Sequence, residues 1–295
     1  MGKLDGKVAL VTGVASEESI AWAIAKELTR QGARVILGYQ FRFHSRIMQL
    51  APTLPNLIAY ERCDVTKPEE VDAFFEKVTT PIDIVIHAIA FAPKTAFDGR
   101  VVETSTEDFT TALVTSAHSL ATLMNETHKH MPNGGSVIAL SYIGGVRVSA
   151  KYKVMGVAKA ALEAYVRELA ADLGPEGIRV NAISAGPIRT IAASGLPELD
   201  LMLEYNRKVS PMRRDVTQKD VGACAAFLAS DGARMITGQT IYVDGGCADS
   251  IGPILAETIC AYGISVQLER TETPLSGRDV AVVADGQWVA PAKTS

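Results

Sequence analysis

Two residues, Tyr152 and Lys159, have the side-chain types and the spacing for proton chemistry. Seven residues span about two turns of a helix, so a helix over residues 152–173 would place both side chains on one face. Gly156 lies between them, where its missing side chain would let a ligand approach. Tyr142 stands ten residues before Tyr152 and follows an apolar run, so we expect it at a strand end. A nearby cation would lower the pKa of a phenol and assist proton transfer.

A tyrosine and a lysine at this spacing also occur on ordinary amphipathic surface helices. The pair therefore indicates chemistry only if the preceding chain builds a binding site for a dinucleotide.

The composition excludes several classes of protein. The chain has 295 residues, of which 47% are hydrophobic, and this is enough for one large domain with a full core. The net charge is −4 and only 6% of residues are aromatic, so nucleic acid and anionic membranes are not expected partners. No stretch is apolar enough for a signal peptide or a membrane span.

Four cysteines are scattered along the chain without the spacing of a metal site: Cys63, Cys224, Cys247 and Cys260. We therefore expect a cytoplasmic protein with reduced thiols and no metal.

Short apolar runs alternate with helical patterns over residues 7–246. The expected strands are residues 7–11, 34–37, 57–63, 82–87, 136–140, 177–184 and 239–243. The main expected helices are residues 20–31, 106–131, 152–173 and 216–230. This alternation predicts an α/β fold with one doubly wound parallel sheet.

Residues 249–295 differ in character and predict a small β appendage. Short strands are expected at residues 264–270, 280–284 and 287–290. The dipeptide Asp285-Gly286 is typical of a two-residue hairpin turn.

The turn Thr12-Gly13-Val14-Ala15-Ser16 joins the first expected strand to the first expected helix. Free backbone N–H groups and the helix dipole at such a junction can bind a phosphate. The full Gly-x-Gly-x-x-Gly spacing is absent, because only Gly13 of the usual glycines remains. Ser16 and Ser19 have hydroxyls that could cap the helix or contact a phosphate.

Polar residues after the second and third strands bear on cofactor choice. Gln40 can hydrogen-bond a ribose hydroxyl, whereas Arg42 or Arg46 could meet a 2′-phosphate or begin a solvated helix. Asp64 could accept a bond from an adenine amine, or it could cap the helix that begins near Pro68.

Of three later features, one is expected in the core and two complete the expected site. His87, on the fourth apolar strand, is expected to be a packed core residue. The small-residue turn 88–93 would let the backbone lie against a cofactor. Residues 191–211 follow a strand and contain Gly195 and Pro197 as hinges, so they suit a substrate lid.

The chain resembles the short-chain dehydrogenases and, within them, the enoyl-acyl carrier protein reductases. Ordinary short-chain dehydrogenases place the lysine four residues after the tyrosine, where this chain has Gly156. The spacing Tyr-x6-Lys, with a second tyrosine ten residues upstream, is the pattern of the enoyl reductases. Further segments look like that family's: 12–16, Ala185-Gly186-Pro187-Ile188-Arg189-Thr190, Ala192-Ala193-Ser194-Gly195 and Val243-Asp244-Gly245-Gly246.

This resemblance implies a role for individual residues. The implied cofactor-binding residues are Gly13, Ser19, Ile20, Gln40, Asp64, Val65, Ile89, Lys159, Ile188, Arg189, Thr190, Ile191 and Ala192. The implied substrate-binding residues are Ala92, Tyr142 and Tyr152, and the implied catalytic residues are Tyr142, Tyr152 and Lys159.

The implied reaction is the NADH-dependent reduction of the trans-2 double bond of an enoyl-acyl carrier protein in fatty acid elongation. Hydride would go to the β-carbon, and Tyr152 would hydrogen-bond the thioester oxygen on which charge develops. NADPH stays open as an alternative to NADH. The resemblance also implies a homotetramer. We expect a reductase domain over residues 1–248, which the resemblance covers, and a separate appendage over residues 249–295.

The chain departs from the family pattern in the turn after the fourth strand, where Ala88 and Ala90 replace the more usual serine and glycine. Its appendage is a further departure, since typical members end soon after the segment 243–246. Two alternative functions are a dehydrogenase of the same fold that acts on a ketone or an alcohol, and a non-catalytic nucleotide-binding scaffold.

Basic residues cluster after the expected lid: Arg207, Lys208, Arg213 and Arg214. An acidic carrier protein could dock there through complementary charge, or the cluster could be a solvated helix face.

Overall fold

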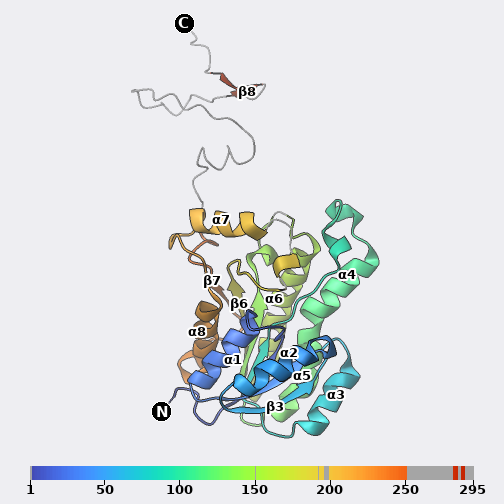
Figure 1. Ribbon diagram of the computed structural model, residues 1–295, viewed down its shortest axis with the longest axis vertical. Coiled ribbons are helices and arrows are strands. Elements are labelled where there is room, and N and C mark those ends of the chain that lie inside the picture. Colours follow the sequence, from blue (N-terminus) through green and yellow to red (C-terminus); the bar gives the residue numbers. More distant parts are fainter. Residues whose placement is uncertain are drawn as a thin grey trace. The chain divides into compact units, whose positions relative to one another are not determined.

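Seven parallel strands form one sheet in the order β3-β2-β1-β4-β5-β6-β7 (Figure 1). The computed structural model describes residues 2–149, 151–191, 193–195, 199–250, 282–284 and 287–289. The strands are β1 (Val8–Thr12), β2 (Arg34–Tyr39), β3 (Leu57–Arg62), β4 (Ile84–His87), β5 (Gly135–Ser141), β6 (Ile178–Ala185) and β7 (Thr240–Val243). The strand order reverses between β1 and β4, which is the usual ligand-binding position of such a sheet.

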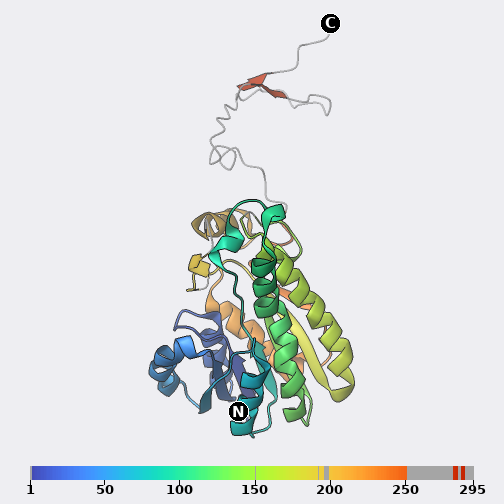
Figure 2. The same ribbon diagram turned by 90° about the vertical axis from the view of Figure 1, so that its right-hand side faces the viewer.

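Helices cover both faces of the sheet, so the predicted doubly wound α/β fold is confirmed. One face carries α1 (Ile20–Arg30), α2 (His44–Leu50) and α8 (Gln218–Ala229). The other face carries α3 (Pro68–Lys77), α5 (Ser119–Thr127) and α6 (Val154–Leu173). Helix α4 (Thr106–Leu113) continues through the π-helical residues Val114–His118 into α5, and Figure 2 shows this long stretch beside α6.

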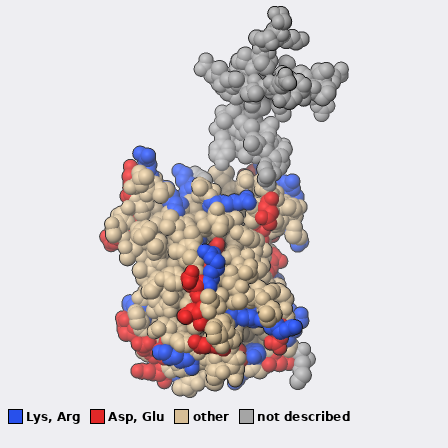
Figure 3. Space-filling model, turned by 180° about the vertical axis from the view of Figure 1, so that it is seen from behind, with Lys and Arg blue, Asp and Glu red and all other residues tan. Residues whose placement is uncertain are grey.

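Charged side chains of both signs are interspersed over the face seen in Figure 3. No helix among the described residues is both long enough and apolar enough to cross a bilayer.

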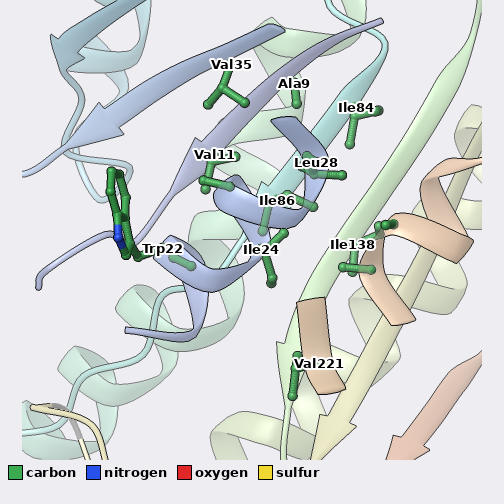
Figure 4. Packing of buried hydrophobic residues seen from close by; sticks show 14 of the residues in the cluster. Ala9, Val11, Trp22, Ile24, Leu28, Val35, Ile84, Ile86, Ile138 and Val221 are labelled. Carbon is green, nitrogen blue, oxygen red and sulfur yellow. The ribbon is translucent and has the colours of Figure 1, made fainter. Parts of the chain in front are cut away.

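The core has two halves because successive residues of a strand point to opposite faces of the sheet. In β1, Ala9 and Val11 belong to the half beneath α1 and α8, and Val8 and Leu10 belong to the half beneath α3, α5 and α6. Figure 4 shows Trp22, Ile24 and Leu28 of α1 among the strand residues of the first half. All of these side chains are at most 2% exposed. Burial on both faces explains the continuous apolar runs of the sequence.

The chain divides into two compact units, Met1–Ser250 and Ile251–Ser295. In the second, β8 (Val282–Ala284) pairs antiparallel with β9 (Gln287–Val289), and Ala284 lies opposite Gln287. The predicted turn Asp285-Gly286 and the predicted strand 264–270 lie outside the described residues.

His87 ends β4 and is completely buried, so the prediction of a packed core residue is confirmed. The hydroxyl of Ser119 donates to the carbonyl of Thr115 at 2.7 Å and lies 2.8 Å from Nε2 of His87. Since that hydroxyl proton is committed, Nε2 carries the imidazole proton and donates to Ser119. Burial, together with the nearby charge of Lys159, lowers the pKa of His87 to about 3. The imidazole is therefore neutral.

The buried imidazole should make stability depend on pH. An unfolded chain protonates His87 near its ordinary pKa of 6.5, whereas the folded chain does so only near 3, so between these values the unfolded state binds more protons. The free energy of unfolding should then fall as the pH falls, by up to about 1.4 kcal/mol per pH unit from this residue. We expect His87→Gln to remove that part of the slope in urea unfolding curves.

The matched control is His118→Gln, because His118 lies on the neighbouring helical stretch with an exposed side chain. Equal slopes for the wild type and His87→Gln would contradict a neutral buried imidazole.

Candidate active site

The carboxyl ends of the central strands lie at one edge of the sheet. Thr12 of β1 pairs with His87 of β4, and Ser141 of β5 pairs with Ser184 of β6. The segments that follow these strands begin with Gly13, Ala88, Tyr142 and Gly186, so the topology alone brings most predicted site residues to this edge. In parallel sheets this edge is where ligands bind.

The turn between β1 and α1 has the geometry of a phosphate site. Gly13 has a φ of 91°, and a Cβ there would lie 2.1 Å from the carbonyl oxygen of Ala88. Ser19 is the N-cap of α1: its Oγ accepts the N–H of Trp22 at 3.4 Å and donates to the carbonyl of Ser16 at 2.7 Å. Of the two predicted roles for Ser19, capping is the one that the structure shows. The first-turn N–H groups beyond the cap can bind an anion.

Gln40 and Asp64 lie together at the ends of β2 and β3. Gln40 Nε2 donates to Asp64 Oδ2 at 3.0 Å, which leaves the amide oxygen of Gln40 as an acceptor for a hydroxyl. Asp64 Oδ1 accepts from the N–H and the hydroxyl of Thr66. Burial raises the pKa of Asp64, but the bonds from Thr66 and Gln40 outweigh it, so the net pKa is lowered. The alternative role of Asp64 as a helix cap is wrong, because the N-cap of α3 is Lys67.

Two arginines lie near Gln40 and Asp64, where the adenosine of a dinucleotide is expected. The guanidinium of Arg42 lies 4.7 Å from the ring centroid of Phe43 and 5.5 Å from that of Phe91. Arg46 donates to the carbonyl of Ala15 in the phosphate turn at 3.3 Å. Each guanidinium has a partner here and keeps further N–H donors, so the choice between NADH and NADPH stays open at these two residues.

Lys159 is a buried ammonium on α6. Its Nζ donates to the carbonyl of Leu140 at 2.6 Å, and two further N–H donors stay available for a ligand. Burial lowers the pKa of Lys159 to about 8, and the charge of Glu163 opposes that effect. Glu163 is itself buried and accepts from the hydroxyl of Ser141 at 2.5 Å.

The two tyrosines lie against each other. The ring centroids of Tyr142 and Tyr152 are 4.8 Å apart, and the ring planes are tilted by 60°. Burial, with a further contribution from Tyr142, raises the pKa of Tyr152, and burial also raises the pKa of Tyr142. The prediction that a cation lowers the pKa of this phenol is therefore wrong in sign. Desolvation disfavours the phenolate, and Lys159 is committed to Leu140.

Two details of the predicted helix are also wrong. Helix α6 begins at Val154, so Tyr152 lies in the turn before it, and Lys153 at the N-cap has a φ of 45°. A Cβ on Gly156 would lie 2.7 Å from the carbonyl oxygen of Gly144. Gly156 therefore permits close packing of α6 on the segment after β5, and it does not open a path for a ligand.

The other predicted residues that the structure describes lie at the same edge, with different degrees of exposure. Those in or against the core are Ile20, Val65, Ile89 and Ile188, and Ala92 packs against the small cluster that contains Tyr152. Arg189 pairs with Asp200 of α7 (Leu199–Val209), Thr190 Oγ1 accepts the N–H of Ala193 at 3.0 Å, and Ile191 is 45% exposed. Ala192 lies outside the described residues.

Sequence reasoning missed one residue that joins two parts of the site. Gln218, the first residue of α8, donates through Nε2 to the carbonyls of Glu18 at 3.0 Å and Arg189 at 3.2 Å. It links the phosphate turn to the segment after β6, and nothing in its sequence surroundings indicates this role.

The residues at this edge fit a dinucleotide. A capped helix N-terminus suits a pyrophosphate, the free oxygen of Gln40 suits a ribose hydroxyl, and the unused donors of Lys159 suit a second ribose. The fold and these donors define the class of protein as a Rossmann-like oxidoreductase that uses a nicotinamide dinucleotide.

A family model described as "Enoyl-(Acyl carrier protein) reductase" matches residues 13–248. The chain belongs to this family of enoyl-acyl carrier protein reductases. The predicted family is confirmed.

Curated relatives named "Enoyl-[acyl-carrier-protein] reductase [NADH] FabI" are similar over most of the chain. The protein of Synechocystis sp. is 46% identical over 251 residues, which cover 82% of this chain and 96% of the relative. The protein of Bacillus cereus is 45% identical over 251 residues, which cover 83% of this chain and 98% of the relative. The protein of Escherichia coli is 44% identical over 251 residues, which cover 83% of this chain and 95% of the relative.

Solved structures agree with this assignment. The Bacillus cereus enoyl-acyl carrier protein reductase with NADP+ and indole naphthyridinone has a TM-score of 0.82 and 45% identity, covering 84% of this chain and 99% of that one. The Anaplasma phagocytophilum reductase in complex with NAD has a TM-score of 0.80 and 43% identity. The match covers 83% of this chain and 95% of that one. The predicted enzyme class and nicotinamide cofactor are confirmed.

The pKa of Lys159 generates a prediction for cofactor binding. A value of about 8, lowered from 10.5, means that the ammonium loses its charge as the pH rises through about 8. An anionic cofactor favours the charged form, so the Kd for NADH should rise by about threefold to tenfold from about pH 7 to about pH 9. Fluorescence titration of the protein with NADH measures this. Lys159→Met should bind weakly with little dependence on pH, and the same pH dependence in that variant would contradict the assignment.

Proposed function

We propose that the chain uses NADH to reduce the trans-2 double bond of an enoyl-acyl carrier protein, with Tyr152 and Lys159 at the reacting end. The observation that carries the assignment of residues is the pair of contacting phenols, one buried and one half-buried, at the edge of the sheet where the cofactor turn lies. The buried ammonium of Lys159 bonds to Leu140 near the end of β5, at that same edge. When bound, NADH supplies the hydride that adds to the β-carbon of the substrate.

Lys159 is proposed to orient the cofactor. Its bond to the carbonyl of Leu140 fixes the direction of the ammonium, and its remaining donors are directed to ribose hydroxyls. Its positive charge also favours the negative charge that develops on the substrate.

Tyr152 is proposed to donate a hydrogen bond to the thioester carbonyl oxygen. Hydride addition to the β-carbon places negative charge on that oxygen as an enolate forms. A hydrogen bond to the oxygen is therefore stronger in the transition state than in the ground state. The raised pKa suits this role, because the phenol keeps its proton over the working pH range. The ring has little freedom, since a Cβ on Gly144 would lie 2.5 Å from Tyr152 Cδ1.

Tyr142 is proposed as the second phenol of the substrate site. Its hydroxyl lies 3.5 Å from Ser149 Oγ, a distance that leaves the phenol ready to exchange this partner for a substrate atom. Ala92 and Phe97 pack, like Tyr142, against the small cluster that contains Tyr152, and they would line the acyl chain.

Single substitutions separate these roles. We expect Tyr152→Phe to lower kcat by about 10²–10³-fold, the usual cost of one oxyanion donor, with an unchanged Kd for NADH. Lys159→Ala should lose most activity and also weaken NADH binding. Tyr142→Phe should have the smaller effect because its hydroxyl is placed as a substrate contact. Loss of NADH absorbance with a trans-2-enoyl thioester measures all three variants.

A parallel panel of ketones and alcohols tests the reaction class. Turnover of that panel in preference to the enoyl thioester would contradict the proposal, and so would near wild-type kcat in Tyr152→Phe.

The acyl carrier protein is proposed to dock on the segment that follows α7. Arg207 pairs with Asp215 at 3.1 Å, and Lys208 pairs with Glu204 at 3.0 Å, so part of their charge is neutralised. Among the described residues no ion pair involves Arg213 or Arg214, and both are exposed. These two arginines are the charges best placed to meet an acidic carrier.

Charge reversal at these arginines tests the docking surface. We expect Arg213→Glu with Arg214→Glu to raise KM for a carrier-linked substrate by about tenfold without changing KM for a coenzyme A thioester. The control reverses Arg30, an exposed arginine of α1 that pairs with Glu27 at 2.7 Å. Equal effects on both substrates would count against docking.

The domain boundaries, the assembly and the location are also part of the proposal. We infer a reductase domain over residues 1–248, with a lid over residues 191–211 that includes α7. The family resemblance supports a homotetramer, and exposed Phe109 and Val157 offer apolar surface for it. The free thiols of the described cysteines are consistent with the predicted cytoplasmic location.

A further inference from the structure

The turn before α6 holds a lysine in a backbone conformation that side chains rarely adopt. Lys153 has φ 45° and ψ −124° and occupies the N-cap of α6 without a side-chain capping bond. Positive φ of this kind is usually adopted by glycine, so a lysine there is strained, and the strain persists only where contacts with the surrounding structure offset it.

The side chain of Lys153 makes two such contacts with a distant loop. Its Nζ donates to the carbonyls of Phe97 at 2.6 Å and Gly99 at 2.5 Å. Hydrogen bonds from an ammonium are stronger than those between neutral groups. We call these two bonds the Lys153 bridge.

The loop that receives the bridge has a shape of its own. Gly99 has a φ of 59°, and the carboxylate of Glu103 accepts the N–H of Arg100 at 2.7 Å. The two carbonyls are therefore presented as a fixed pair, and the bridge attaches the turn before α6 to that pair.

Tyr152 adjoins the bridge both in the sequence and in the packing. It precedes Lys153 directly, and it packs in one buried cluster with Ala96 and, more loosely, Phe97 of the bridged loop. The backbone of Tyr152 also bonds on both sides of the turn, because its N–H donates to Ser149 and its carbonyl accepts from Met155. The conformation of Lys153 is therefore coupled, through the backbone of the turn, to the direction of the phenol.

We propose that Lys153 is a positioning residue for Tyr152: its ammonium, bonded to the carbonyls of Phe97 and Gly99, holds the strained turn that directs the phenol at the substrate. This inference rests on the proposed function of Tyr152. Lys153 lies outside the set of residues that the sequence pattern assigned to the site, since only its conformation and its partners reveal it.

The first test replaces the ammonium and keeps the length of the side chain. Lys153→Met should lower kcat for a trans-2-enoyl thioester by about tenfold, as a small misplacement of a catalytic group does, while the Kd for NADH changes less than about twofold. Lys153→Arg should recover most of kcat, because a guanidinium can donate to both carbonyls. Lys151→Met is the matched control, since Lys151 also has a positive φ, of 63°, and its side chain is exposed.

A second variant separates the bridge from backbone strain. Lys153→Gly removes the bridge and the backbone strain together. It should therefore lose kcat as Lys153→Met does, but it should melt at a higher temperature than Lys153→Met. If Lys153→Met does not fold, Lys153→Gly carries the same kinetic test. Wild-type kcat in Lys153→Gly would overturn the proposal.

A double-mutant cycle shows whether Lys153 acts through the phenol. In the Tyr152→Phe background, Lys153→Met should lower the residual kcat by less than about twofold, because the group that it positions is gone. An equal loss in both backgrounds would overturn the proposal. If Lys153→Met has normal kcat while Tyr152→Phe is inactive, the positioning role of Lys153 is overturned and the role of the phenol stands. If Tyr152→Phe itself has normal kcat, the proposed role of the phenol is overturned.

Discussion

Burial of ionisable groups at one edge of the sheet is the constraint on which the site depends. Tyr152, Lys159 and His87 are all withdrawn from water, and burial is the largest cause of the pKa shift of each. Desolvation disfavours whichever form is charged, so it keeps the phenol and the imidazole neutral and works against the ammonium. This edge thus holds a neutral phenol, a neutral imidazole packed in the core behind it, and one cation whose charge must be supported by its neighbours.

The parallel topology supplies that support. The Leu140 carbonyl that receives Lys159 belongs to β5, the strand that delivers Tyr142 to the site. One hydrogen bond therefore fixes α6 against β5 and aligns the lysine with the strand end. Glu163, one turn further along α6, adds a negative charge on the same side and bonds to Ser141 at the end of β5.

Much of the fold and of the site could be predicted from the sequence because local patterns determine them. Apolar runs on both sides of every helix predicted the buried parallel sheet, and the sheet in turn placed Gly13, Tyr142 and Lys159 at one edge. The resemblance added the spacing of tyrosine and lysine, which no periodicity could interpret by itself.

The remaining features depend on contacts between residues far apart in the chain. The start of α6 is set by Lys153, whose partners lie 54 and 56 residues earlier, so no window around Tyr152 could reveal that the tyrosine precedes the helix. The role of Gly156 depends on the carbonyl of Gly144, which only packing brings near. The pKa of Tyr152 was predicted with the wrong sign because burial, which a sequence does not display, is the largest cause of its shift.

The site depends most on the charge state of Tyr152, which nuclear magnetic resonance of ring-labelled tyrosine measures directly. The Tyr152 resonance is assigned by its absence from the spectrum of Tyr152→Phe and followed as the pH is raised. The structure predicts that this resonance stays that of a neutral phenol at pH 10, the ordinary pKa of the group. A tyrosinate signal below about pH 9 would contradict the account, because it would mean that a neighbouring charge, and not burial, governs the phenol.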